Sequence, residues 1–213
     1  MKRIILYWFK IQAASTARKL LIKHYSKKEV QEILVGYWQK YLKLKNDVPA
    51  MPTMGGSIMV HLAAMSTAFY QELTTWGNSK EKATQMFYDI AWKEYVKMGK
   101  FSWWLAGRRK KNNYQRLLTA TRLFRAFPFN SPSYGWQDVK TDRNVVGFDC
   151  VKCPVAEYFS KNGLSDFCAA TWCALDYPLA EMWNAKLERS GSIAGGAKKC
   201  DFRWIVKSNE ENV

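Results

Sequence analysis

The sequence predicts an α+β fold, in which an N-terminal helical half is followed by a small antiparallel sheet with packed helices. Three observations lead to it. Apolar residues recur at helical spacing through most of residues 1–125, Pro, Ser and Gly interrupt the pattern at 126–135, and short β-branched and aromatic runs follow. Of the 213 residues, 48% are hydrophobic, which is ample material for a core. We expect a single domain over 1–213, with a mainly helical part at 1–125 and a cysteine-containing α+β part at 126–213.

The clearest helix signal follows Ser26. Ser26 and Glu29 have the spacing of a capping box, in which the two side chains satisfy free amides at the start of a helix. Apolar residues then recur every three or four positions, at Val30, Ile33, Leu34, Tyr37, Trp38, Tyr41 and Leu42. This spacing gives one wide apolar face. Two prolines and two glycines in 46–56 end the helix.

Further helices are expected before residue 126. One covers 57–76 and ends at Gly77, a second is capped by Ser79, and a shorter one covers 114–125. The chain starts with a basic pair and an apolar stretch, as a secretion signal does, but Lys10 interrupts this stretch after six residues. We therefore predict a core-facing or interfacial first helix. No apolar run is long enough to span a membrane.

The second half is predicted to contain two strand pairs with helices between them. The runs 136–140 and 145–150 resemble a hairpin, and 185–190 pairs with 200–207 around a turn rich in small residues. Between the pairs, Ser165 is placed to cap a helix through Cys173 and Asp176 that Pro178 ends or kinks.

The last predicted strand has two chemically different faces. Cys200, Phe202 and Trp204 share one face because side chains alternate along a strand, and the two aromatic rings favour a core. Asp201 and Arg203 share the opposite face, where they can meet water, each other or a polar ligand. The alternation thus predicts that Cys200 points inward.

The formal net charge is +15, with a pI near 9.6, which favours anionic partners. The one tight basic cluster is Arg108–Lys111, and neither zinc-finger spacing nor an RNA-recognition motif accompanies it. Nucleic acid therefore ranks as a minor hypothesis, and a small carboxylate-bearing molecule ranks above it. Peripheral contact with an anionic membrane stays open, and the sequence specifies no oligomeric state.

All five cysteines fall between residues 150 and 200, at Cys150, Cys153, Cys168, Cys173 and Cys200. Their odd number and the missing secretion signal favour reduced thiols in a cytoplasmic protein. Three interpretations remain open. The thiols could be small buried hydrophobes, zinc ligands with Cys153, Cys173 and Cys200 as candidates, or a catalytic centre at Cys173. Asp176 lies three residues after Cys173 and shares its helix face, where it could orient a substrate or act as a base.

The second half of the chain contains four short motifs: Cys153-Pro154, Cys173 with Asp176, Arg189 to Gly195, and Cys200-Asp201-Phe202-Arg203-Trp204. With these motifs, the sequence from Cys153 onward resembles the L-2-amino-thiazoline-4-carboxylic acid hydrolase family. The resemblance extends back to about Tyr25 and is densest after Cys150. More distantly, the "CDFRW" ending is similar to small-ligand-binding domains of the vinyl-reductase type, which are often sensory.

The resemblance implies hydrolytic opening of a cyclic amidine or thiazoline carboxylate, the namesake product being N-carbamoyl-cysteine. Cys173, Asp176 and Cys200 are the candidate catalytic residues. Arg203 would pair with the substrate carboxylate, since a guanidinium matches its shape, and Asp201 would bind the exocyclic amine. The reaction requires no cofactor by this route, and zinc remains an open alternative. A ligand- or metal-binding module without turnover is the second hypothesis.

Overall fold

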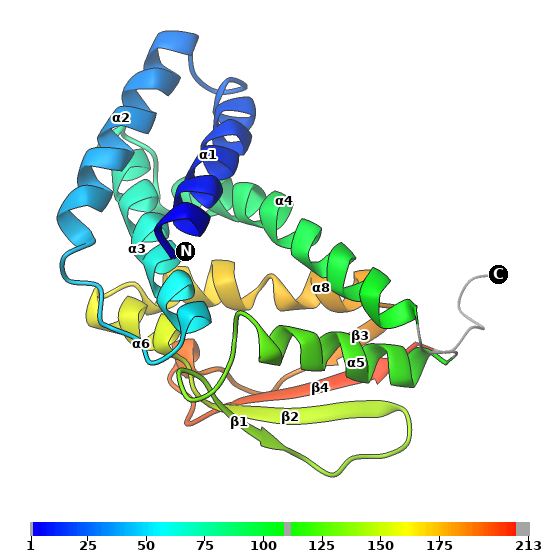
Figure 1. Ribbon diagram of the computed structural model, residues 1–213. Coiled ribbons are helices and arrows are strands. Elements are labelled where there is room, and N and C mark those ends of the chain that lie inside the picture. Colours follow the sequence, from blue (N-terminus) through cyan, green and yellow to red (C-terminus); the bar gives the residue numbers. More distant parts are fainter. Residues whose placement is uncertain (1, 109–111, 208–213) are drawn as a thin grey trace.

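The computed structural model describes residues 2–108 and 112–207, and within them long helices stack above a four-stranded antiparallel sheet (Figure 1). The α+β prediction is confirmed. The first part contains α1 (Lys2–Leu21), α2 (Lys27–Leu44), α3 (Met54–Thr75), α4 (Lys80–Gly107) and α5 (Asn113–Ala126). The second part contains β1 (Gly135–Asp138), β2 (Val145–Lys152), α6 (Pro154–Lys161), α7 (Ser165–Cys168), the π-helix η1 (Ala169–Cys173), α8 (Asp176–Met182), β3 (Ala185–Glu188), the 3-10 helix η2 (Ile193–Gly195) and β4 (Cys200–Val206).

The predicted capping box begins α2. The Glu29 amide donates to the Ser26 hydroxyl over 3.3 Å, and the Ser26 amide donates to the Glu29 carboxylate over 2.8 Å. These bonds satisfy two amides that the first helical turn leaves free. The apolar face is buried at Val30 and Ile33, whereas Leu42, placed on this face by spacing, is 38% exposed.

Helix α3 begins at Met54, three residues earlier than predicted. The Thr53 hydroxyl accepts from the Gly56 amide over 3.0 Å and lies 2.8 Å from the hydroxyl of Ser133. A Cβ atom at Gly56 would overlap the Ser133 side chain. The glycines that suggested a loop therefore belong to the helix, because they let a distant segment approach its first turn.

The single helix expected after Ser165 is divided. The residues form α7, the π-helix η1 and α8 in succession. Pro178 neither ends nor kinks a helix here; it lies in the first turn of α8, where a missing amide costs little. The wider π-turn changes which side chains share a face, and it brings Cys168 and Cys173 together.

The two predicted strand pairs join into one sheet of order β1-β2-β4-β3, since β2 pairs with β4. Cys200, Phe202 and Trp204 are all buried, so the inward face of β4 is as predicted. The ring of Phe202 stacks on Phe148 of β2, with centroids 5.3 Å apart. The inner face of the sheet is therefore largely aromatic.

Buried side chains of both parts form one hydrophobic cluster. Trp183, which is 1% exposed, follows α8 and packs edge-on against Phe124 of α5, with centroids 5.0 Å apart. Its indole nitrogen donates to the Gly99 carbonyl of α4 over 3.0 Å. The second part is thus fixed to the helices above it.

Helix α1 contributes Ala17 and Leu21 to the buried core, as a core-facing helix should. None of the described helices is both long enough and apolar enough to cross a membrane. Of the basic cluster, residues 109–111 lie outside the described part of the chain. The guanidinium of Arg108 lies 4.2 Å from the ring centroid of Trp104.

Candidate active site

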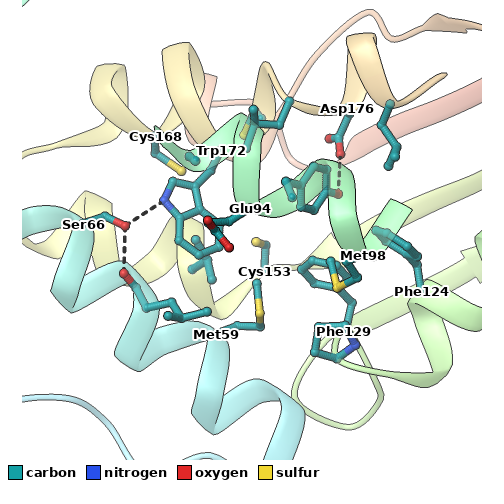
Figure 2. A pocket seen from close by; sticks show the side chains of 18 of the residues that line it. Met59, Ser66, Glu94, Met98, Phe124, Phe129, Cys153, Cys168, Trp172 and Asp176 are labelled. Carbon is teal, nitrogen blue, oxygen red and sulfur yellow. Dashed lines mark hydrogen bonds between the residues drawn. The ribbon is translucent and has the colours of Figure 1, made fainter. Parts of the chain in front are cut away.

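A cavity of about 310 Å³ lies between the helices and the inner face of the sheet (Figure 2). Helices α3 and α4 contribute Met59 and Met98, α5 contributes Phe124, the segment after α5 contributes Phe129, and η1 contributes Trp172. The Trp172 indole nitrogen donates to the Ser66 hydroxyl over 3.3 Å, which fixes the ring against α3. Most of the wall is apolar.

All five cysteines line this cavity and are free thiols. The chain brings them together from different elements: Cys150 from β2, Cys153 from the N-cap of α6, Cys168 from α7, Cys173 from η1 and Cys200 from β4. Their concentration in sequence therefore corresponds to a concentration in space.

The π-helix brings Cys168 and Cys173 together. Its hydrogen bonds join residues five apart, so two side chains with this separation share one face. A hydrogen bond from Cys168 lowers the pKa of Cys173 despite opposition from burial and the Asp176 charge, and Arg189 and Ser192 lower it further. The same hydrogen bond and burial raise the pKa of Cys168. Cys173 is thus the thiol prepared to ionise.

Asp176 lies beside this thiol as a buried carboxyl. Tyr95 of α4 donates to its Oδ1 over 3.3 Å (Figure 2), and Arg189 contacts its Oδ2 at 3.2 Å. Burial raises the pKa of Asp176 to about 6, although Arg189 and the Tyr95 hydrogen bond act in the opposite direction. The group can therefore exchange a proton near neutral pH.

Arg189 completes the polar end of the cavity. The candidate site residues predicted from the sequence did not include it. Its side chain is 6% exposed, and its second terminal nitrogen donates to the Cys173 carbonyl over 3.2 Å. Arg189 directly follows β3, whereas the predicted strand covered 185–190. Alternation along that predicted strand places Arg189 on the face of Ala185 and Leu187, both of which are buried. This alternation and the Arg189 to Gly195 motif of the family resemblance were the available signals. Tyr95 was also missed, since a helical tyrosine gives no such signal.

Asp201 and Arg203, predicted as substrate-binding residues, are not among the residues that line this cavity. Asp201 accepts hydrogen bonds from the amides of Ser190 and Gly191. Burial raises its pKa, but the hydrogen bond from the Ser190 hydroxyl, together with these amide bonds, outweighs that effect and brings it to about 2. Arg203 donates to Asp149 over 2.9 Å. The physical reason is alternation, because both side chains leave β4 on the face opposite Cys200.

Cys200 lines the cavity, but its thiol differs from that of Cys173. Its sulfur accepts from the Ile193 amide over 3.2 Å, and burial raises its pKa to about 12. Cys200 is therefore a neutral thiol near pH 7. Within the described residues, no three His, Cys, Asp or Glu side chains are grouped to hold a metal ion. The suggested set of Cys153, Cys173 and Cys200 is thus not assembled there as a metal centre.

The raised pKa of Asp176 predicts a stability that falls with rising pH. Its folded pKa of about 6 exceeds the unfolded value of about 3.9, so the folded protein binds more protons between these limits. Ionisation of Asp176 does not change the free energy of unfolding below about pH 4, and its whole destabilising effect is present above about pH 6. Two pKa units correspond to about 3 kcal/mol. Urea unfolding of Asp176→Asn should therefore show the variant gaining about that much on the parent from pH 4 to 7.

Asp201→Asn is the matched control, and the change in its stability with pH is expected to have the opposite sign. Because the folded pKa of Asp201 is depressed to about 2, its stabilisation is present above about pH 4 and is lost as pH falls toward 2. A difference between parent and Asp176→Asn that does not change with pH would contradict the environment described for Asp176.

Cys168→Ala is expected to raise the pKa of Cys173, because it removes the hydrogen bond that lowers it most. Iodoacetamide alkylates thiolates, so the rate of Cys173 modification should reach its midpoint at higher pH in the variant. Peptide mass spectrometry separates this site from the other thiols. Cys150→Ala should leave the midpoint unchanged, and an unchanged midpoint in Cys168→Ala would remove Cys168 from this role.

Comparisons with known proteins identify one family. The sequence profile described as L-2-amino-thiazoline-4-carboxylic acid hydrolase matches residues 58–204. No curated protein matches the chain. Two crystal structures align over most of it, the Fe(II) unliganded H-NOX protein from K. algicida and a mutant of that protein. The mutant is 9% identical over 93% of this chain and 96% of its own, and the parent is 8% identical over 92% and 96%. Both have a TM-score of 0.44.

Proposed function

The chain belongs to the L-2-amino-thiazoline-4-carboxylic acid hydrolase family, and from this premise we propose that it hydrolyses a thiazoline or related cyclic amidine carboxylate. The family name suggests a hydrolase. The finer proposal places the reaction at the end of the cavity formed by Cys173, Asp176 and Arg189.

One observation carries this proposal: a thiol of lowered pKa lies beside a carboxyl group that titrates near pH 6, and both face one cavity. Thiolates are strong nucleophiles, and a neighbouring acid or base is the partner that addition to a C=N bond requires. Arg189 adds a fixed positive charge beside them. These groups supply a nucleophile, a proton donor and a carboxylate-binding group.

In the proposed first step, the Cys173 thiolate attacks the ring carbon between nitrogen and sulfur. A C–S bond forms, the C=N electron pair moves to nitrogen, and protonated Asp176 supplies the proton. The intermediate then restores its C=N bond and expels the ring sulfur, and the proton on nitrogen passes to this sulfur, which leaves as a thiol. The opened substrate is now attached to Cys173 as a thioimidate.

In the second step, water adds to the thioimidate carbon while the Asp176 carboxylate accepts a proton from it. Collapse of this intermediate forms the carbonyl, the second proton of the water passes to the nitrogen, and the electron pair of the C–S bond returns to the Cys173 sulfur as the thiolate. The net change is addition of one water and cleavage of the ring C–S bond. For the 2-amino substrate, the product is N-carbamoyl-cysteine.

Arg189 is the proposed partner of the substrate carboxylate, a role first assigned to Arg203. A guanidinium has five N–H donors, and two contacts are described for this one, to Asp176 and to the Cys173 carbonyl. Donors therefore remain for a carboxylate, and a paired, nearly buried guanidinium binds in a fixed orientation.

Mass spectrometry tests the reaction class directly. Purified protein is incubated with L-2-amino-thiazoline-4-carboxylate in H₂¹⁸O, with and without a chelator. We expect a product heavier than the substrate by one labelled water, with a rate that the chelator does not change. Loss of turnover with chelator would contradict the thiol route and favour a metal-dependent one.

A ligand-binding module without turnover is the second candidate, and the largely apolar wall of the cavity favours it. Stoichiometric binding of a carboxylate with no labelled product would support this function instead.

A further inference from the structure

The cavity exceeds what the namesake substrate requires. That substrate is one small ring bearing an amine and a carboxylate, whereas about 310 Å³ lies within the range of pockets that hold drug-sized molecules. The polar groups of the proposed reaction occupy one end, on η1, α8 and the segment after β3. The remainder extends between α3 and α4, where the wall includes Met59, Leu62, Phe69, Phe87, Ile90 and Met98.

Four charged side chains line the described wall, and each of them is paired. The charged lining residues are Glu94, Arg125, Asp176 and Arg189. Arg125 forms an ion pair with Asp138 outside the cavity at 2.6 Å, and Glu94 pairs with Lys97 and with the Thr16 hydroxyl. The Asp176–Arg189 pair is thus the charged group at the thiol end, and Glu94 lies on the α4 wall between Ile90 and Met98, where it is already paired. An elongated ligand would meet the Asp176–Arg189 pair at one end and mostly hydrocarbon along its body.

We infer that the ligand of this cavity is an amphipathic carboxylate, whose head group lies at Arg189 and whose alkyl or aryl body lies between α3 and α4. This inference rests on the proposed function for its head group, which would be a thiazoline-4-carboxylate. The apolar body would then be the substituent on the ring carbon between nitrogen and sulfur. The same addition of water and C–S cleavage would give an N-acyl-cysteine.

Chain-length dependence of binding is the primary test, on the unmodified protein. Isothermal titration with butanoate, octanoate and dodecanoate should show affinity rising about fourfold per added CH₂ until the cavity is filled, the value expected for full burial of each group. The matched alcohols lack the charge and should bind more weakly than the carboxylates. Affinity that does not depend on chain length would overturn the inference.

Three variants locate the binding: one matched pair that tests the apolar arm and one substitution of Arg189. Leu62→Trp fills the apolar arm from α3 and should weaken dodecanoate binding at least tenfold. Leu42→Trp makes the same change at an exposed position of α2 and should leave binding unchanged. Arg189→Gln should remove the preference for carboxylate over alcohol. Thermal unfolding first establishes that each variant is folded, and retained affinity in folded Leu62→Trp would contradict the assigned arm.

Turnover separates this inference from the proposed function. A thiazoline-4-carboxylate with a 2-octyl substituent is compared with the 2-amino compound under identical conditions. Chain-length-dependent binding with a lower KM for the octyl compound supports both proposals. The same binding without any product retains the ligand class and rejects the hydrolase. Efficient turnover of the 2-amino compound, with no effect of chain length, retains the hydrolase and rejects the ligand class.

Discussion

Cys173→Ser is expected to lower kcat on the thiazoline carboxylate by about a thousandfold or more, the order of loss seen when a covalent nucleophile is removed. The serine hydroxyl is nearly isosteric but does not ionise near neutral pH, so the first C–S bond is not formed. Steady-state assays with product quantified by mass spectrometry measure the loss. KM should change much less, because substrate binding is assigned to other groups.

Cys150→Ala is the control for this experiment. Its thiol donates to the Lys152 carbonyl over 3.2 Å and has no part in the proposed chemistry, so turnover should stay within a few-fold of the parent. Intact-mass measurement of the parent during turnover should also reveal a covalent adduct that Cys173→Ser does not form. Full activity in Cys173→Ser would reject the thiol as nucleophile.

Arg189→Gln is expected to raise KM about 10- to 100-fold, because a charge-assisted hydrogen bond contributes roughly 1.5–3 kcal/mol. The pH profile should also change. The Arg189 charge lowers the pKa of Asp176, so its loss should move the Asp176 titration in the kcat/KM profile to higher pH. Steady-state kinetics from pH 5 to 8 measure both effects.

Arg203→Gln is the matched substitution on the opposite face of β4. Arg203 pairs with the buried carboxylate of Asp149, which Lys199 also contacts. Its loss should therefore reduce stability while leaving KM and the pH profile unchanged. A raised KM in Arg203→Gln with a normal KM in Arg189→Gln would restore the assignment that the sequence suggested.

Local physical chemistry in the sequence was sufficient for much of the fold. Capping at Ser26 depends on neighbouring residues alone, and strand alternation alone predicted that Cys200 points inward. The spacing of Cys173 and Asp176 likewise identified the two groups that the structure brings to one end of a cavity. Each of these features depends on contacts within a few residues, which a single sequence contains.

Tertiary structure decided the remaining features of the site. Periodicity assumes ordinary α-helix, so it could not anticipate the π-turn that pairs Cys168 with Cys173. Strand alternation assigned Cys200 and Arg203 to opposite faces of β4. It did not show that the face of Cys200 is the one that lines the thiol end of the cavity. For this reason the sequence pointed to Arg203 as the carboxylate-binding residue, although Arg189 is the arginine that lines the thiol end of the cavity.

The sequence by itself therefore determined the α+β class, most of the helices and strands, and the spacing that brings Cys173 near Asp176. The position of Arg189 beside them, the lowered pKa of Cys173 and the raised pKa of Asp176 were decided by the tertiary structure. The physical reason is that burial and charge act through space, and they depend on segments such as α4 and β3 that lie far from η1 in the chain.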